Sequence, residues 1–167
     1  HVVQFFGVSC TAVSRFLEIR VVLELAPQGS LDVILHGKGI PSFWKGVQDA
    51  WWKEREEYVK ERGLGWVTMI ANAVQFLHDL QIVHCDIKPG NVLLFDDGKT
   101  AKLSDLGSFY LKPDPMWQFS SSIATKNGVG FTDRYKAPER IADEANLSFK
   151  ADIWSLGLIA YEIAHGT

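Results

Sequence analysis

The segment that most constrains the fold of this chain is residues 151–164, ADIWSLGLIAYEIA, close to its C-terminal end. Its length predicts a helix, but its apolar residues occupy nearly every face of that helix instead of one stripe. A helix that is apolar all round is typical of the interior of a protein. Because the sequence ends at Thr167, few residues follow that could cover it. We therefore expect that the chain is a fragment and that further residues surround this helix in the complete protein.

The composition is that of an ordinary globular domain and excludes several other classes. The 167 residues are 47% hydrophobic and 22% charged with a net charge of -3, which excludes a disordered or fibrous chain. The mild acidic balance argues against a nucleic-acid partner, which requires a basic surface. No uncharged stretch reaches the ~20 apolar residues of a membrane span, and the N-terminus carries no signal-peptide pattern. Because Cys10 and Cys85 are too few for a disulfide framework, we expect an intracellular, cytoplasmic location.

Two apolar runs near the N-terminus predict strands. Residues 2–8 and 16–25 are rich in β-branched and aromatic side chains, as paired strands are. Pro27 and Gly29 then end the second run, since proline cannot donate a ladder hydrogen bond. Ser30 offers a hydroxyl cap for a short helix that follows.

Two different helical patterns come next. Residues 44–62 are the most charged part of the chain and contain i,i+4 ion pairs in the favourable order, which predicts a helix. We interpret it as a solvated surface helix, with a docking surface for a partner around Trp51 as the alternative. Residues 66–80 carry apolar side chains three and four apart, which predicts a separate, core-facing helix. Beyond it, the runs at 91–95 and 100–103, joined by Asp-Asp-Gly, predict a β-hairpin.

The polar segment at residues 84–91, HCDIKPGN, carries the candidate functional side chains. Asn91, together with Asp105 after the predicted hairpin, supplies an amide and a carboxylate oxygen of the kind that Mg²⁺ accepts alongside phosphates. Asp86 is then left to receive a proton from a hydroxyl group. Lys88 adds a positive charge suited to a phosphoryl oxygen. The alternative interpretation of these aspartate and asparagine residues is a set of turn-forming side chains.

Together, five motifs make the chain resemble the eukaryotic protein kinase family. All five occur in the family's order, and that order is more specific than any one of them. VLELAPQGSL at 22–31 resembles the hinge, and HCDIKPGN at 84–91 resembles the catalytic loop. DLG at 105–107 resembles the metal-binding triplet. APE at 137–139 resembles the end of the activation segment, and DIWSLG at 152–157 resembles the start of the central helix.

The resemblance implies a catalytic role for each matching polar residue. Asp86 would orient the substrate hydroxyl and accept its proton, and Lys88 would neutralise charge on the transferred phosphoryl group. Asn91 and Asp105 would hold Mg²⁺ ions that bridge the phosphates of ATP. The lysine at position 88 resembles the serine/threonine-directed form of the loop.

The same resemblance implies the nucleotide contacts. The backbone of Glu24 and Ala26 would meet the edge of the adenine. Leu23 would close the back of that pocket, and Leu93 would lie under the ring. In the activation segment, Thr132 also agrees with the serine/threonine-directed members. The Lys88-Pro89 pair and the motifs at 137–139 and 152–157 resemble those of members that act on proteins, so the implied substrate is a protein.

The resemblance implies an α+β, protein-kinase-like fold, with part of the small-lobe sheet and the hinge followed by the first half of the mainly helical large lobe. On this basis residues 1–167 form one partial kinase domain. Its expected parts are small-lobe strands at 1–25, the hinge and following helix at 26–35, an insertion-like charged segment at 36–65 and a partial large lobe at 66–167.

The sequence departs from the family pattern at several positions. Cys85 stands where many members have an arginine that pairs with a phosphate on the activation segment, and a thiol cannot make that contact. We therefore expect that phosphorylation at residues 120–122 or at Thr125 does not act through Cys85. We interpret Cys85 as an inert small apolar residue and His84 as a packed core histidine. Leu106 replaces the usual phenylalanine, and neither a G-x-G-x-x-G motif nor a V-A-I-K strand lysine occurs within the 167 residues.

The expected function is that of an ATP-dependent protein serine/threonine kinase that uses Mg²⁺ and acts on a protein substrate, and the isolated fragment is expected to be inactive. Two alternatives remain, a pseudokinase that uses the fold to bind partners without efficient catalysis, and a phosphotransferase for small molecules. The complete set of Asp86, Asn91 and Asp105 favours the enzyme over the scaffold. A Gly-rich strand and a strand lysine upstream of residue 1 would distinguish the two.

Overall fold

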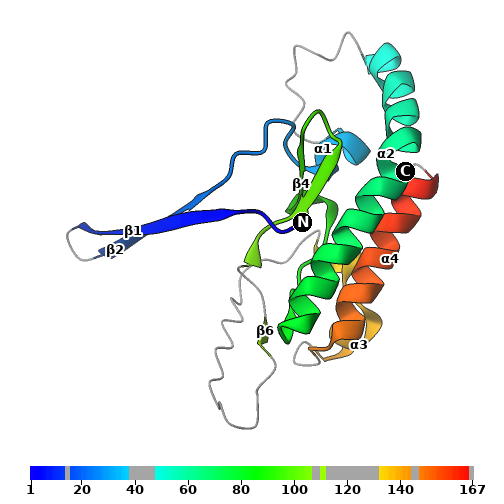
Figure 1. Cartoon of the computed structure of the whole chain (residues 1–167). Coiled ribbons are helices and arrows are strands. Elements are labelled where there is room, and N and C mark those ends of the chain that lie inside the picture. The colour runs from blue at the N-terminus through cyan, green and yellow to red at the C-terminus, as the bar shows by residue number, and fades with distance from the viewer. Residues whose placement is uncertain (14–15, 38–47, 107–109, 112–131, 144–146, 166–167) are drawn as a thin grey trace.

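The computed structural model of the chain describes residues 1–13, 16–37, 48–106, 110–111, 132–143 and 147–165 (Figure 1). Short antiparallel strand pairs and helices are combined in an α+β arrangement. The elements, in chain order, are β1 (Phe5–Val13), β2 (Phe16–Leu23), α1 (Leu31–His36), α2 (Gln48–Asp79), β3 (Ile82–Val83), the 3₁₀ turn η2 (Pro89–Asn91), β4 (Val92–Phe95), β5 (Thr100–Leu103), β6 (Tyr110–Leu111), the 3₁₀ turn η4 (Thr132–Tyr135), α3 (Pro138–Ala142) and α4 (Phe149–His165).

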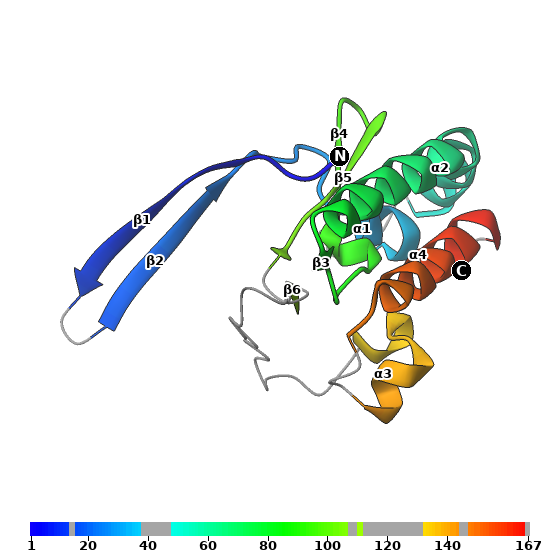
Figure 2. The same ribbon diagram turned by 60° about the horizontal axis from the view of Figure 1, so that its bottom comes forward.

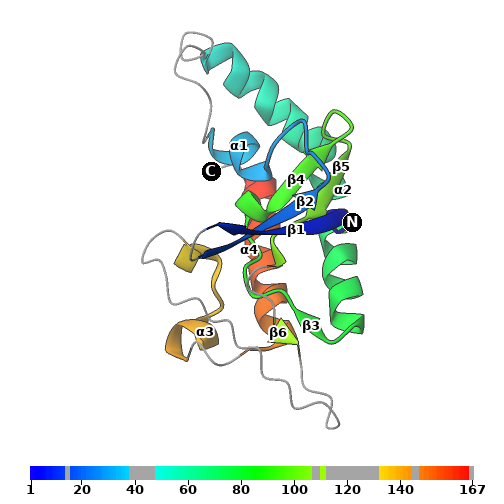
Figure 3. The ribbon, with the colours of Figure 1, turned by 90° about the vertical axis from the view of Figure 1, so that its left-hand side faces the viewer.

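The body of the molecule is built on α2 and α4, which lie side by side and run in opposite directions (Figures 1 and 2). The β4–β5 hairpin packs against α2. The short helix α1 lies near the C-terminal end of α4 (Figure 3), where His36 Nε2 comes within 3.7 Å of the Glu162 carboxylate. Burial of each large apolar side chain in such a core contributes about 1.5–3 kcal/mol. The core includes fully buried side chains of α2, of the hairpin and of α4, namely Trp66, Ile70, Val74, Leu94, Leu103 and Ile159.

The predicted hairpin at 91–103 is confirmed. Strand β4 pairs antiparallel with β5, so that Leu93 lies opposite Lys102. The turn between them places Asp96, Asp97 and Gly98 in the left-handed region, at φ of 53°, 54° and 76°. Aspartate and glycine tolerate that region, which explains why Asp-Asp-Gly closes this turn.

The two predicted N-terminal strands are also confirmed, with different bounds. Strand β1 begins at Phe5 and not at residue 2, because residues 1–3 pair with β5 instead. The N–H of Val3 donates to the carbonyl of Leu103 at 2.9 Å, and the N–H of Leu103 donates to His1 O at 2.8 Å. These bonds attach the start of the chain to the body before β1 leaves it.

Beyond this attachment, the β1–β2 hairpin extends away from the body (Figure 2). The two strands pair antiparallel with each other. Their apolar side chains stay largely exposed within the described part of the chain, for example Phe6 at 61% and Ile19 at 60%. The hairpin is therefore held to the body mainly at its base.

Helix α2 is one continuous helix, so the prediction of two separate helices with a break before Trp66 is wrong. Glycine weakens helices, and two glycines, Gly63 and Gly65, lie near the expected boundary. Gly63 instead lies where α2 packs against α4, and a Cβ at this position would overlap with Cγ2 of Ile163. Glycine therefore permits close approach of the two helices and does not end α2.

The two halves of α2 are fixed to the same hairpin turn. Tyr58 Oη donates to the carbonyl of Asp97 at 3.0 Å, and Trp66 Nε1 donates to the carbonyl of Gly98 at 2.6 Å. Each half thus gains a tertiary contact that supports helical continuity. The interpretation of 36–65 as an insertion relative to the family stays a prediction, and the side chain of Trp51 lies outside the described residues.

Helix α4 confirms the predicted C-terminal helix. Its buried face contains Ala151, Ser155 and Ile159, which are spaced four residues apart and lie toward the body. On the opposite side Trp154 and Tyr161 remain exposed within the described residues. The expectation that further residues surround this helix in the complete protein stays a prediction.

Candidate active site

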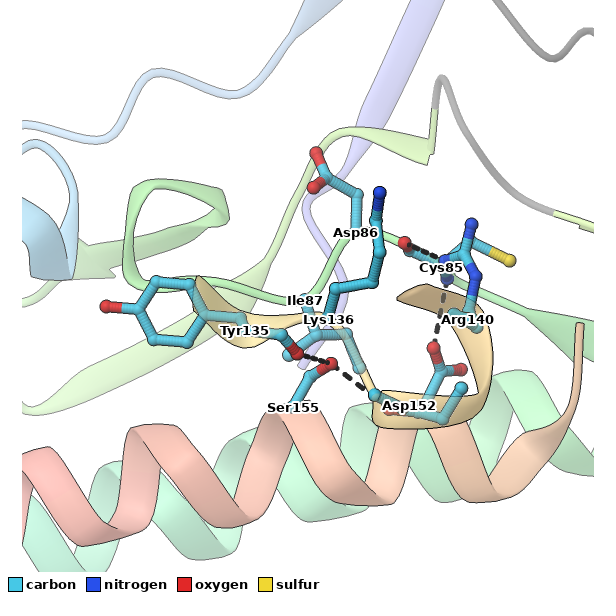
Figure 4. A pocket seen from close by; sticks show the side chains of 10 residues that line it. Cys85, Asp86, Ile87, Tyr135, Lys136, Arg140, Asp152 and Ser155 are labelled. Atoms are coloured by element: carbon cyan, nitrogen blue, oxygen red, sulfur yellow. Dashed lines mark hydrogen bonds between the residues drawn. The ribbon is translucent and has the colours of Figure 1, made fainter. Parts of the chain in front are cut away.

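A buried carboxylate on α4 anchors the polar loop that follows β3. Oδ2 of Asp152 accepts the backbone N–H of His84 at 2.8 Å. Oδ1 accepts the backbone N–H of Cys85 at 2.9 Å, as Figure 4 shows. Nε2 of His78 in α2 lies 2.9 Å from Oδ2. Asp152 is only 1% exposed, and buried charge is tolerated where several donors surround it. One side chain therefore fixes the loop to both long helices.

His84 is fully buried and joins the loop to the end of β5. Its Nε2 lies 3.0 Å from the carbonyl of Ser104, and its Nδ1 accepts the N–H of Asp86 at 3.3 Å. These partners require the neutral ring with its proton on Nε2. Burial lowers the pKa of His84, while the nearby Asp152, Asp86 and Asp105 carboxylates oppose that shift. The interpretation of His84 as a packed, hydrogen-bonded core histidine is confirmed.

The loop brings three of the candidate catalytic side chains into contact. Lys88 Nζ donates to Oδ2 of Asp86 at 2.7 Å, and Nδ2 of Asn91 donates to the same oxygen at 2.9 Å. Nδ2 of Asn91 also reaches the backbone carbonyl of Asp86 at 2.8 Å. Cys85 adopts a left-handed φ of 70°, which turns the chain so that Asp86 can make these contacts. Asp86 and Asn91, five positions apart in the sequence, are thus joined by direct hydrogen bonds.

Asp105 follows a residue that is held against the same loop. The N–H and the hydroxyl of Ser104 both donate to the carbonyl of Asn91, at 2.8 and 2.9 Å. Asp105 itself is exposed and has a left-handed φ of 62°. The charges of the Asp105 and Asp86 carboxylates both act to raise the pKa of His84, so both carboxylates lie near the buried His84 ring.

The arrangement offers few protein ligands for a metal ion. Among the described residues, no group of three or more histidine, cysteine or acidic side chains is placed to hold one. Asn91 uses its amide nitrogen on Asp86, which leaves its oxygen as the ligand atom. An amide oxygen and the exposed Asp105 carboxylate fit Mg²⁺, which takes one or two protein ligands and completes its shell with phosphate oxygens and water.

The hinge candidates lie along the edge of β4. The N–H of Leu94 donates to the carbonyl of Gly29 at 2.9 Å, and Ser30 forms a bridge with Leu93. Lys102, opposite Leu93 in the hairpin, binds the Glu24 carboxylate at 2.7 Å. The residues proposed to contact adenine therefore come from two segments that are bonded to each other.

Ala26 and Leu23 belong to the same candidate hinge segment, and Leu23 is exposed within the described residues. Thr132 begins η4, but its side chain lies outside the described part, as do residues 120–122, Thr125 and Phe131.

Sequence reasoning did not find the long-range partners of the site. The pairing of Glu24 with Lys102 spans 78 residues, and no local pattern signals it beyond a charged side chain inside an otherwise apolar strand. The role of Asp152 as an anchor was also not predicted, although its motif was noted.

A pocket lies between the loop, η4 and the start of α4 (Figure 4), and is lined in part by Cys85, Asp86, Lys136, Arg140 and Asp152. Arg140 donates to the carbonyl of Cys85 at 2.6 Å. Burial raises the pKa of the Cys85 thiol to about 11, so the thiol stays protonated near neutral pH. This supports the interpretation of Cys85 as an unreactive side chain.

The comparisons with known proteins agree with this geometry. A family model described as the protein kinase domain matches residues 1–167, and the chain therefore belongs to the protein kinase family. Its α+β fold is that of a protein kinase domain.

Three relatives illustrate the similarity. Serine/threonine-protein kinase cst-1 of Caenorhabditis elegans is 44% identical over 167 residues, which cover 99% of this chain and 28% of that protein. Integrin-linked protein kinase 1 of Arabidopsis thaliana is 31% identical over 170 residues, with 99% and 30% covered. Serine/threonine-protein kinase DCLK2 of Homo sapiens is 38% identical over 113 residues, with 66% and 13% covered. The chain thus spans less than a third of the length of these relatives.

Within the described ranges, none of the helices combines the length and the apolar character needed to cross a bilayer.

Proposed function

We propose that the protein containing this chain is an ATP-dependent serine/threonine protein kinase, which transfers the γ-phosphoryl group of ATP to a hydroxyl group of a protein substrate. The observation that carries the proposal is the bonded set of Asp86, Lys88 and Asn91 beside the strand that leads to Asp105. The printed names of relatives at 44% identity, serine/threonine-protein kinases, support the same class of substrate.

Asp86 would orient the substrate hydroxyl and accept its proton as the phosphoryl group is transferred. Oδ2 of this carboxylate is occupied by Lys88 and Asn91, so Oδ1 is the atom that we propose for the hydroxyl. The two donors fix the rotamer of Asp86. Lys88, at the edge of the same site, would place its positive charge beside the transferred group.

Asn91 and Asp105 are the proposed ligands of Mg²⁺, through an amide and a carboxylate oxygen. When bound, the ion would neutralise negative charge on the phosphates of ATP. The backbone of Glu24 and Ala26 would contact the adenine edge. The two apolar side chains proposed to border the adenine are Leu23, behind it, and Leu93, beneath it.

The same proposal covers the organisation of the chain. Residues 1–25 would belong to the small lobe, 26–35 to the hinge and the next helix, 36–65 to an insertion, and 66–167 to the large lobe. Thr132 would contribute to substrate recognition in the activation segment. Use of ATP and an exposed free thiol at Cys10 fit an intracellular location.

The test replaces the proposed base in the full-length protein. Asp86→Asn keeps the shape of the side chain but removes its proton affinity, so we expect kcat for phosphorylation of a serine/threonine peptide to fall about 100-fold to 10,000-fold. Binding of Mg·ATP should persist, because the proposed nucleotide contacts remain. Radiolabelled phosphate transfer and calorimetric nucleotide titration measure the two properties. Asp97→Asn, the same change at an exposed turn residue, should leave both unchanged.

The second candidate is a pseudokinase, which a Gly-rich strand and a strand lysine upstream of residue 1 would argue against. It predicts that the wild-type protein binds nucleotide without turnover. Equal transfer rates for wild type and Asp86→Asn would remove Asp86 as the base, and no transfer by the wild type would favour the pseudokinase.

A further inference from the structure

The carboxylate of Glu24 is bonded to two other segments of the chain. Lys102 Nζ donates to both of its oxygens, at 2.8 and 2.7 Å. The backbone N–H of Gln4 donates to Oε1 at 2.6 Å. The side chains of Glu24 and Lys102 are only 16% and 25% exposed, so the pair is partly shielded from water.

Lys102 is itself held in place by the hairpin. It lies opposite Leu93 in the β4–β5 register, and its Nζ lies 4.5 Å above the ring of Phe95, in a cation–π contact. Leu93 and Phe95 are two residues apart on β4 and share a face with Lys102. The ammonium group therefore sits between the ring of Phe95 and the carboxylate of Glu24.

This ion pair lies at the base of the β1–β2 hairpin, which extends from the body (Figure 2). The backbone N–H of Glu24 donates to Gln4 O at 3.0 Å, and residues 1–3 pair with β5. The bonds of Glu24 thus connect the start of the hairpin, its end and strand β5. A change at this point alters how the hinge is placed over β4.

We propose that Lys102 is a positioning residue for the nucleotide, which through its ion pair with Glu24 holds the hinge backbone at a fixed separation from Leu93 and so sets the affinity for the adenine ring. This inference rests on the proposed function, since it uses the hinge backbone and Leu93 as the two walls of the adenine site. Lys102 touches neither the phosphates nor the reacting hydroxyl in this assignment. Its effect is therefore on nucleotide binding and not on the chemical step.

The experiment compares variants of the full-length protein by Mg·ATP affinity, KM for ATP and kcat at saturating ATP. Lys102→Met removes the charge and keeps the apolar stem, and we expect Kd and KM for ATP to rise roughly tenfold, equivalent to about 1.4 kcal/mol, with kcat changed less than twofold. Lys102→Arg retains the ion pair and should bind ATP like the wild type. Lys99→Met, at the exposed turn of the same hairpin, is the matched control and should have no effect.

A charge exchange keeps the test valid if a single variant folds poorly. Lys102→Glu places two carboxylates together and should weaken ATP binding, and the double variant Glu24→Lys with Lys102→Glu should recover most of it. Unchanged ATP affinity in Lys102→Met, tighter binding, or loss confined to kcat would each overturn the inference. A wild-type protein that does not bind Mg·ATP would instead refute the proposed function, so the two failures are distinguishable.

Discussion

Glu24 illustrates how one side chain can couple local charge to the stability of the fold. The hydrogen bond from Lys102 lowers the pKa of Glu24 below its ordinary value of 4.5. Burial opposes this shift with the second-largest effect, and the N–H of Gln4 adds to the lowering. A carboxyl group with a lowered pKa stabilises the folded state above its ordinary pKa. That stabilisation disappears as the pH falls through the folded-state value.

This predicts a pH-dependent effect of Glu24→Gln. At pH 7 the variant should melt at a lower temperature than the wild type, because it lacks the charged partner of Lys102. As the pH falls below 4.5 the two melting temperatures should converge, since the wild-type carboxylate becomes protonated as well. Thermal unfolding followed by circular dichroism from pH 7 to pH 3 measures the difference. A difference that stays constant over this range would contradict the assigned ion pair.

At the level of elements, the contact between α2 and α4 depends on a glycine. Gly63 is buried, and a Cβ there would overlap with the side chain of Ile163. Gly65, two residues further along the same helix, is exposed and has open space around it. The two glycines therefore separate the effect of close packing from the effect of helix propensity.

We predict opposite outcomes for alanine at these two positions. Gly63→Ala should destabilise the protein by about 1–3 kcal/mol, because the added methyl group forces the helices apart. Gly65→Ala should stabilise it by roughly 0.5–1 kcal/mol through improved helix propensity. Chemical denaturation measures both changes in the free energy of unfolding.

The double variant Gly63→Ala with Ile163→Ala gives a further check on the same contact. Removal of Cγ2 of Ile163 makes room for the new methyl group, so the combined loss should be smaller than the sum of the two single losses. Strict additivity would show that α2 and α4 do not approach each other at Gly63 as described.

At the scale of the whole molecule, Asp152 joins the parts that form the candidate site. It binds the backbone of His84 and Cys85 and lies 2.9 Å from His78 of α2. Loss of this one carboxylate leaves buried donors without an acceptor, which costs more than the bond itself contributes.

We predict that Asp152→Ala lowers the free energy of unfolding by about 3–5 kcal/mol. It should also reduce the rate of phosphate transfer per folded molecule, because the loop that carries Asp86 loses its anchor. Denaturant unfolding and single-turnover transfer measure the two effects. Asp79→Ala, at an exposed aspartate that accepts only from Gln75 among the described contacts, is the matched control and should cost less than about 1 kcal/mol. Similar costs at both positions would argue against the anchoring role.

Local sequence patterns predicted most of the elements. The Asp-Asp-Gly turn identified the β4–β5 hairpin because few residues tolerate its left-handed backbone. The length of one apolar segment identified α4, and the spacing of apolar residues identified the second half of α2. The polar loop at 84–91 was found as a group because its members are close in the sequence, and its internal bonds span at most five residues.

Other features depended on packing and had no local signal. Gly63 by itself suggests the end of a helix, and only the structure shows that Ile163, 100 positions away, packs against it. The residue pairs Glu24–Lys102 and His84–Asp152 are 78 and 68 positions apart, and periodicity carries no information about such partners. The sequence predicts one strand over residues 2–8, but the first of these residues pair with β5 instead of β2.

The amino-acid order alone thus determined which helices and strands form and which polar side chains are available for chemistry, since backbone propensity and short-range bonding act between near neighbours. Only the tertiary structure decided how α2 continues past Gly63, which buried acid holds the loop, and which lysine supports the hinge. Those outcomes depend on close packing and on pairing of charges away from water, and both arise only when distant segments meet.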